Sequence, residues 1–452
     1  MNSVISFLIE RKRTLMKMQN SSKKIFILSF LIVTTMTSTN VDAAANGGKC
    51  SKAGQVQVTK GVRYVCVKSG NRAIWRKKDA PSKGKPVPSA TASTTSTIAL
   101  NQDPGITSIN SLLSVQECRI QDATFNQSSS VSSGFPRPDF IRSGFGQLEV
   151  LVIPVSFADL PFSSEDATAL ESTFSRVNSF YSAMSYGNAS IKMTLATSST
   201  WVDIGGNLEQ NGLVNTPPQW DGSSFYRKVV ENYSRNNTTS GYDVVVVITA
   251  NTTRISGGQG MPSGSRSIYG TQKNFSGIQL FGSLGRIWGV LAHEIGHAWL
   301  GFEDLYLFKG GSPLGVWDTM SNSGSEFNGW SRFLAGWIDS NWVRCTSPRS
   351  QTRHFLSSLG SSKKEDWPRI LVLPLSSSSA VVAELRIPNE WQSSLTNPKL
   401  VVYRVDTSID HGNGPIKLVG TIDAKGGVIS TDGFSITVDG IDGNGVLINV
   451  GP

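Results

Sequence analysis

The segment LAHEIGHAWLGFEDLY, residues 291–306, restricts the fold of this chain more than any other, because His293 and His297 stand four residues apart in it. The chain has four histidines in 452 residues, so half of them lie within one helical turn. Apolar residues surround the pair at positions that favour a mostly buried helix, namely Ile287, Val290, Leu291, Ile295 and Trp299. Unpaired imidazoles are costly in such surroundings, so the pattern predicts a buried helix that carries a functional site.

Residues four apart on an α-helix project from the same face, so His293 and His297 can bind one metal ion together. Neutral imidazoles are preferred zinc ligands, and Glu294 falls on the neighbouring edge of the helix. From there its carboxylate can accept a proton from water that the metal activates. This HExxH arrangement predicts a zinc site with Glu294 as its catalytic base. The alternative is a helix with two surface histidines and no metal.

Catalytic zinc usually has three protein ligands, and the residues after the helix supply candidates for the third. Gly301 is suited to end the helix and turn the chain back towards the metal. Glu303 and Asp304 follow at once. On residue type alone, either acid can be the third ligand.

Further segments extend the signal beyond the metal motif. They are HEIGHAWLGFEDLY (293–306), GVWDTMSNSG (315–324), WSRFLAGW (330–337), LVIPVSFAD (151–159), FYSAMSYGNASIKM (180–193) and, more loosely, KLVVYRVD (399–406). Together they resemble the immune inhibitor A family of secreted bacterial zinc metallopeptidases, over roughly residues 148–410. The resemblance implies a metzincin-like metallopeptidase domain, a peptide or protein substrate and bound zinc.

The family's HExxHxxGxxD pattern implies that the zinc ligands are His293, His297 and Asp304, with Glu294 as the catalytic residue. This sequence departs from the pattern, since Gly301 lies four residues after His297 rather than three. Strict spacing selects Glu303, whereas the Asp-Leu-Tyr context selects Asp304. We favour Asp304, because a turn absorbs an inserted residue easily.

The segment Trp317-Asp318-Thr319-Met320-Ser321 resembles the Met-turn of related metallopeptidases. That resemblance implies that Met320 packs beneath the zinc ligands without binding the metal. On residue type alone, Met320 is equally compatible with an ordinary core position.

The first 44 residues have the pattern of a secretory signal peptide. Lys23 and Lys24 precede an apolar run over residues 25–33, and Val41-Asp42-Ala43 suits a signal peptidase site. The apolar run is too short for a stable transmembrane anchor. We therefore expect a secreted or extracellular protein, with association to the cell surface as a variant of that expectation.

Charge is distributed unevenly along the chain. Residues 1–100 contain 17 Lys/Arg against 3 Asp/Glu, which leaves 25 against 30 for the rest. Much of the excess lies in a small predicted β module, residues 45–79, and a Pro/Ser/Thr-rich linker follows at residues 80–100. An anionic cell-envelope polymer is a candidate partner for residues 45–85, and a solvated basic face is the alternative. Without a recognised motif, the charge does not indicate nucleic-acid binding.

The remaining chain predicts an α+β fold. Apolar runs at residues 148–160 and 242–250 indicate buried strands. Between them, Leu170, Phe174, Val177, Tyr181 and Met184 mark one face of a helix. Residues 101–345 are predicted to form the metallopeptidase domain. Short apolar runs separated by turn residues predict a C-terminal β-sandwich at residues 346–452.

Four cysteines in an exported chain indicate two disulfides. We expect Cys50 to pair with Cys66, which would staple the β module, and Cys118 to pair with Cys345.

Three other polar residues have weaker claims to a metal role. His354 and His411 are expected on the surface of the C-terminal region. Glu326 is the candidate in an alternative zinc site with a distant glutamate, but its surroundings, SGSEFNG, indicate a loop.

These patterns support two hypotheses. The first is a secreted zinc metalloendopeptidase that hydrolyses peptide bonds, with calcium as a candidate second ion that stabilises loops. The second is a catalytically inactive exported binding or adhesion protein that keeps a metallopeptidase-like domain. The extra residue after His297 is the feature that motivates the second hypothesis.

Overall fold

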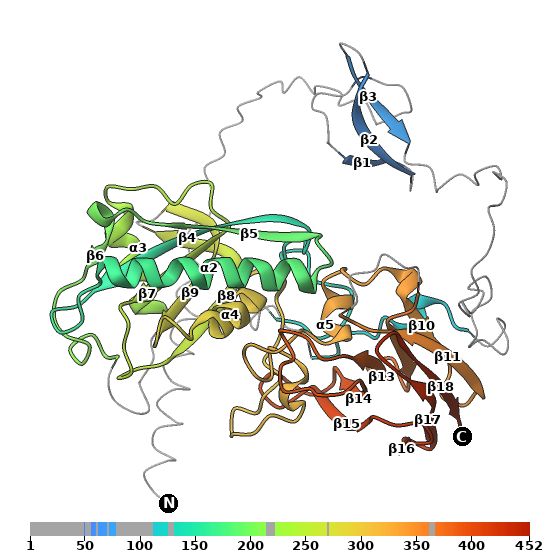
Figure 1. The fold of residues 1–452 in the computed structure, drawn as a ribbon. Coiled ribbons are helices and arrows are strands. Elements are labelled where there is room, and N and C mark those ends of the chain that lie inside the picture. The colour runs from blue at the N-terminus through green and yellow to red at the C-terminus, as the bar shows by residue number, and fades with distance from the viewer. Residues whose placement is uncertain are drawn as a thin grey trace, which may run out of the picture. The chain divides into compact units, whose positions relative to one another are not determined.

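A computed structural model describes residues 49, 56–59, 62–69, 72–77, 112–124, 131–213, 222–268, 271–360 and 367–452 (Figure 1). The chain divides into two compact units, Met1–Ser96 and Thr97–Pro452. The predicted signal peptide (1–44) and linker (80–100) lie outside the described residues. No helix in the described part is long and apolar enough to cross a membrane.

The first unit contains an antiparallel three-stranded sheet. Its strands are β1 (Val56–Thr59), β2 (Val62–Ser69) and β3 (Arg72–Lys77), in the order β1-β2-β3. Cys66 and Trp75 are register partners on β2 and β3, and both are buried. Cys66 is disulfide-bonded, whereas its predicted partner Cys50 lies outside the described residues. A disulfide and one aromatic ring therefore form the centre of this small sheet.

The second unit begins with a six-stranded sheet in the order β5-β4-β7-β9-β8, with β6 beside β4. The strands are β4 (Gly146–Ser156), β5 (Ala189–Leu195), β6 (Val202–Asp203), β7 (Val244–Thr249), β8 (Gly257–Ile268) and β9 (Thr271–Phe281). All neighbours run parallel except β8, which is antiparallel to β9 at the edge. The predicted apolar strands correspond to β4 and β7, and every residue of β7 is buried.

Helices cover both faces of this sheet, and the alternation along β4 shows how. Leu148, Val150 and Val152 share a core with α2 (Ser164–Met184) and α4 (Trp288–Leu300). Leu151, Ile153 and Val155 share a second core with α3 (Gly222–Ser234) on the opposite face. In Figure 1, α2 runs across the strands. The prediction that this region combines helices with strands is therefore confirmed, although the sheet is mostly parallel rather than of the α+β kind.

The helix α2 follows its sequence signals closely. Ser163 caps its N-terminus by accepting a hydrogen bond from the Asp166 backbone, and Asp166 accepts one in return from the Ser163 backbone. Of the five residues in the predicted apolar face, four are buried and Phe174 is partly buried. The remaining helical segments are short: η2 (Val115–Cys118), η3 (Ser198–Thr200), η4 (Gly315–Trp317), α5 (Gly329–Leu334) and η5 (Ser340–Trp342).

The hairpin of β8 and β9 lies between β7 and the metal-motif helix, and no apolar strand pattern marks β8 in the sequence. The β8 sequence GGQGMPSGSRSI has the composition of a loop. However, β8 lies directly against α4, and a Cβ atom on Gly258 would come within 2.6 Å of Glu294 Oε1. The close approach of the helix therefore requires glycine there. For this reason the sequence of β8 lacks the residue pattern that is typical of a strand.

Two further sheets form the C-terminal part. One has the order β10-β12-β13-β14-β15, and the other β11-β18-β17-β16. Their strands are β10 (Val343–Cys345), β11 (Thr352–Ser357), β12 (Ile370–Pro374), β13 (Ser379–Arg386), β14 (Lys399–Asp406), β15 (Ile416–Ile422), β16 (Val428–Thr431), β17 (Phe434–Ile441) and β18 (Gly445–Gly451). Apolar side chains from both sheets form one hydrophobic cluster. Additional C-terminal β-structure is therefore confirmed.

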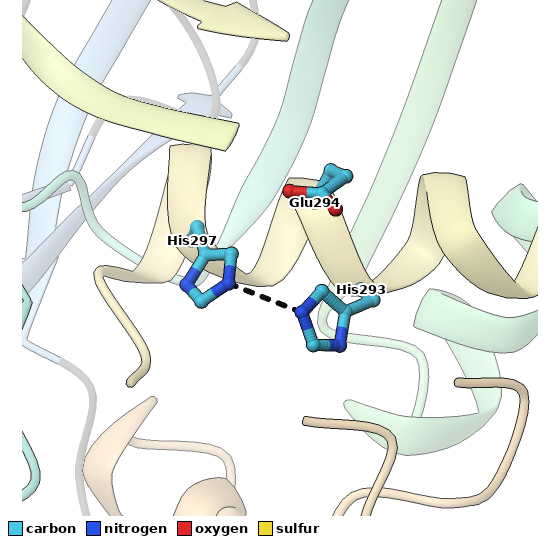
Figure 2. A group of neighbouring side chains, drawn as sticks. All are labelled: His293, Glu294 and His297. Carbon is cyan, nitrogen blue, oxygen red and sulfur yellow. Dashed lines mark hydrogen bonds between the residues drawn. The ribbon is translucent and has the colours of Figure 1, made fainter. Parts of the chain in front are cut away.

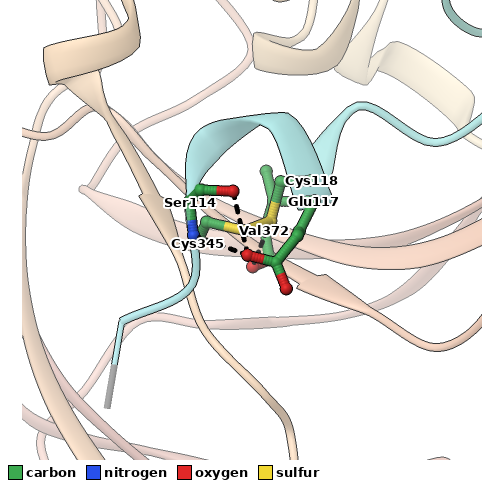
Figure 3. The surroundings of a disulfide bond; sticks show 5 residues. All are labelled: Ser114, Glu117, Cys118, Cys345 and Val372. Atoms are coloured by element: carbon green, nitrogen blue, oxygen red, sulfur yellow. Dashed lines mark hydrogen bonds between the residues drawn. A yellow bond between two sulfur atoms is a disulfide. The ribbon is translucent and has the colours of Figure 1, made fainter. Parts of the chain in front are cut away.

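Cys118 and Cys345 form the predicted disulfide, which joins η2 to β10 (Figure 3). The two residues are separated by 227 positions in the sequence. Such a long closed loop restricts the unfolded chain strongly. The bond therefore ties the start of the second unit to its C-terminal sheets.

Replacing Cys118 and Cys345 together by alanine is expected to lower the free energy of unfolding by about 2–4 kcal/mol, because the unfolded chain gains conformational entropy. Denaturant titration of the oxidised proteins measures the difference. Cys66→Ala is a control, since Cys66 belongs to the other unit. Equal midpoints for the double variant and the wild type would contradict the prediction.

A buried ionic network connects the C-terminal sheets to the segment around Asp318. Arg386 on β13 donates to Glu384 at 2.6 Å, to Glu326 at 2.7 Å and to the Trp317 carbonyl at 2.8 Å. Arg332 adds a second bond to Glu326 at 3.1 Å. Each buried carboxylate thus has charged and neutral donors that offset its desolvation.

Arg386→Lys is expected to lower the unfolding free energy by about 1–3 kcal/mol. Lysine keeps the charge but cannot reach both carboxylates and the carbonyl with one planar group. Arg353→Lys is the matched control, since Arg353 is 39% exposed in its pair with Asp439. We expect the control to change stability by less than about 0.5 kcal/mol. Similar losses for both variants in denaturant titrations would count against this role of the network.

Candidate metal centre

The helix α4 carries the metal motif at the centre of the core. His293, Glu294 and His297 are all buried on it. The Tyr181 hydroxyl of α2 donates to the Ala292 carbonyl at 2.8 Å, which fixes α4 against its neighbour. Gly301 ends the helix in the left-handed conformation, with φ of 57°. The chain then turns back, as the sequence predicted.

The turn brings three side-chain atoms together. His293 Nε2 and His297 Nε2 are 3.1 Å apart (Figure 2). Asp304 Oδ1 lies 3.0 Å from the first nitrogen and 3.1 Å from the second. One ligand atom each of His293, Glu294 and His297 also lies within 4.8 Å of the others. The structure therefore gathers both imidazoles and Asp304 around one point.

The tautomers of the two histidines are set by their other nitrogens. His293 Nδ1 lies 2.9 Å from the Thr319 carbonyl oxygen, and His297 Nδ1 lies 2.6 Å from the Phe302 carbonyl oxygen. A carbonyl oxygen only accepts, so each Nδ1 carries a hydrogen. In the neutral imidazole, each Nε2 then presents a lone pair. Two nitrogen lone pairs and a carboxylate oxygen converge, which calls for a positive charge between them.

The donor set fits zinc. Ligands held at 2.0–2.2 Å around tetrahedral zinc are separated by roughly 3.3–3.5 Å. The separations of 3.0–3.1 Å in the structure differ from that range by a few tenths of an ångström. Without a metal, a proton must supply the charge: burial lowers the pKa of His297, but Asp304 raises it to about 9. A metal ion can take the place of that proton.

The two candidate third ligands have different surroundings. Burial acts to raise the pKa of Asp304, but the charges and hydrogen bonds of the two imidazoles keep it well below its usual range. Burial, together with the charges of Asp122 and Asp410, raises the pKa of Glu303 to about 8 although Arg137 opposes the shift. Glu303 Oε2 is buried and has no hydrogen-bond partner within the described structure. At neutral pH, Asp304 is thus ionised next to the imidazoles, whereas Glu303 is largely protonated.

Glu294 leaves α4 in a different direction from the two rings (Figure 2). Its carboxylate lies against Gly258 of β8. Burial raises the pKa of Glu294, while the imidazoles oppose that shift. The edge strand and the helix therefore hold this carboxylate between them.

Met320 lies next to the helix that carries the metal motif. It is fully buried, and its sulfur packs against Gly296, between the two histidines in sequence. Its carbonyl accepts from the Leu305 backbone at 2.9 Å. The Asp318 carboxylate fixes this segment by accepting from the Met320 and Asn328 backbones, each at 2.7 Å. The segment therefore supports the helix and the turn after it.

Of the three other polar residues considered, Glu326 lies in a loop as expected, whereas His354 and His411 are placed differently from the sequence expectations. Glu326 is buried between Arg332 and Arg386, so its carboxylate is already paired with two guanidinium groups. His354 is buried in β11, 2.8 Å from the Thr352 hydroxyl, and the surface prediction for it was wrong. His411 lies beside the metal centre, with Nε2 4.0 Å from Asp304 Oδ2.

Tyr306 also belongs to the surroundings of the centre. Its ring stacks on His293 with ring centroids 6.1 Å apart, and burial together with the charge of Asp304 raises the pKa of its hydroxyl. The sequence placed Tyr306 near the motif without fixing its direction. The local turn could not reveal His411, because it approaches from a loop more than 100 residues away.

Comparison with known families supports the chemistry of this arrangement. Residues 167–299 match the model of the reprolysin-like metallopeptidase family M12B. The matched segment runs from α2 to the end of α4 and includes His293, Glu294 and His297. The chain contains a metallopeptidase domain. The match to this metallopeptidase domain stops before Glu303 and Asp304, so it does not address the third ligand.

No curated protein sequence matches the chain. The metallopeptidase assignment thus rests on the family model and on the buried His-Glu-His group. The more specific resemblance to immune inhibitor A remains a prediction.

Proposed function

We propose that the protein is a secreted zinc metalloendopeptidase with a metzincin-like domain of the immune inhibitor A kind. The observation that carries the proposal is the convergence of His293 Nε2, His297 Nε2 and Asp304 Oδ1 within 3.0–3.1 Å. These three residues would hold the zinc. Met320 would pack beneath them as a Met-turn residue.

Zinc bound there would act as a Lewis acid that polarises the scissile carbonyl and makes water more acidic. Glu294 would accept the proton of the attacking water and later deliver it to the leaving amine. Its buried position between α4 and β8 supports this role, since burial raises the pKa of Glu294 and makes its carboxylate a stronger base.

The order of the first sheet supports a metzincin-like fold, because an antiparallel edge strand, β8, lies alongside the helix that carries the motif. The shared core of the two C-terminal sheets supports a β-sandwich. Export is supported by the Cys118–Cys345 disulfide, since such bonds persist in oxidising compartments. Calcium binding and an anionic partner of residues 45–85 remain predictions.

The extra residue after His297 motivated the hypothesis of an inactive binding protein. In the structure this residue is accommodated in the turn, where the Phe302 backbone donates to the Gly296 carbonyl at 3.2 Å. Asp304 still contacts both imidazoles. The geometry therefore favours the peptidase.

Purified protein is expected to contain about one zinc per chain and to digest casein. A chelator should stop digestion, and added zinc should restore it, because the three ligand side chains release the metal and bind it again. Metal analysis and a casein assay measure both effects. Zinc without chelator-sensitive digestion would favour the inactive binding protein instead.

A further inference from the structure

A loop of the C-terminal sheets brings another histidine to the metal centre. The loop joins β14 to β15 and contains Asp410-His411-Gly412-Asn413-Gly414. His411 Nε2 lies 4.0 Å from Asp304 Oδ2, on the oxygen that does not face the two imidazoles. Three of the four histidines in the chain therefore meet at one site.

The loop is fixed to the segment that follows Asp304. The Phe308 backbone donates to the Gly412 carbonyl at 3.0 Å, and Leu307 forms a bridge with Asn413. The His411 ring packs edge-on against Phe308, with ring centroids 5.0 Å apart. Gly412 has φ of 72°, and a Cβ atom on it would collide with the Phe308 ring. Glycine at this position allows the loop to dock and so positions His411.

Neither nitrogen of the His411 ring forms a hydrogen bond in the described structure. Its Nδ1 is buried without a hydrogen-bond partner, and Nε2 is beyond hydrogen-bond distance from Asp304. The His411 side chain is 30% exposed, so a bound molecule can reach it. An imidazole held rigidly at a reaction centre without a partner is suited to bind a ligand.

Peptide hydrolysis needs a hydrogen-bond donor for the negative charge that develops on the carbonyl oxygen. We propose that His411 is this donor and that it contacts the carbonyl oxygen of the bound peptide through Nε2–H. The inference rests on the proposed peptidase function and adds a catalytic residue from the C-terminal sheets. Loss of one such donor typically lowers kcat by about 10²–10³-fold.

The test compares His411→Ala with the wild type in zinc content, peptide cleavage and affinity for a peptide phosphonate. A phosphonate is tetrahedral and anionic, so it mimics the transition state of peptide hydrolysis. One of its oxygens takes the place of the negatively charged oxygen that His411 would contact. We expect His411→Ala to keep its zinc, to lose roughly 10²-fold or more in kcat with little change in KM, and to bind the phosphonate on the order of 10²-fold more weakly. His411→Gln, with an amide donor, should recover part of the loss.

Two further variants separate a direct role from a structural one. Gly412→Ala should reproduce the His411→Ala defect, because the loop can no longer dock on Phe308. Gly440→Ala, where no atom lies within 4 Å of the added Cβ, is the matched control and should behave as the wild type. Loss of zinc or of thermal stability in His411→Ala would overturn the inference in favour of a structural role.

The phosphonate measurement does not require turnover, so it distinguishes the two proposals. A wild type that holds no zinc would contradict the peptidase function and, with it, this role of His411. A zinc-loaded wild type whose phosphonate affinity is unchanged by His411→Ala would contradict the His411 inference alone.

Discussion

Replacing Glu294 by glutamine is expected to lower kcat by about 10²–10⁴-fold while leaving zinc bound. Glutamine has the same shape as glutamate and can keep the packing against Gly258, but it cannot accept the proton of the attacking water. Because Glu294 is assigned no ligand role, the zinc content should stay near that of the wild type. Peptide cleavage with excess zinc, together with metal analysis, measures both quantities.

Glu303→Gln is the matched control for this change. Burial, together with Asp122 and Asp410, raises the pKa of Glu303 to about 8, so glutamine resembles its form at neutral pH. We expect the cleavage rate of this control to stay within about threefold of the wild-type rate. The substitution should change the activation free energy by less than about 1 kcal/mol. A Glu294→Gln variant that binds zinc and cleaves at the native rate would remove Glu294 from the catalytic role.

Asp304→Asn is expected to weaken zinc binding by more than the roughly 10–100-fold that follows from changing an outer-shell partner. Asparagine keeps the shape of the side chain but removes the charge that faces both imidazoles at 3.0 and 3.1 Å. Competition with a chromophoric chelator measures the zinc affinity. The same measurement on Glu303→Gln should give a value within about threefold of the wild type.

The reverse pattern, with zinc lost from Glu303→Gln and kept by Asp304→Asn, would assign the third ligand to Glu303. It would also mean that the turn after Gly301 rearranges when the metal binds. Equal effects of the two variants would contradict the distinction drawn between these neighbouring acids.

Local sequence patterns were sufficient for much of the fold and for the core of the site. The spacing of His293 and His297 predicted their common face, and the valine run predicted β7. The apolar face of α2 was also predicted from the sequence. These features depend on residues within one or two turns of each other, where periodicity and residue type determine the structure.

Features that depend on distant partners could not be predicted in this way. The strand β8 has a loop-like composition because α4 packs against it, and α4 begins 20 residues after β8 ends. Arg386 reads as the polar end of a strand, yet it is buried between Glu326 and Glu384. His411 reads as a surface residue of a turn, yet the docked loop carries it to Asp304. Each position follows from tertiary packing rather than from its neighbours in sequence.

The most direct test of the coordination is a crystal structure of the zinc-loaded protein with anomalous scattering measured at the zinc edge. We expect a single strong peak at about 2.0–2.2 Å from His293 Nε2, His297 Nε2 and Asp304 Oδ1. Glu294 and Glu303 should lie outside direct bonding distance of it. A peak bound by Glu303 in place of Asp304, or no zinc between the two imidazoles, would contradict this account.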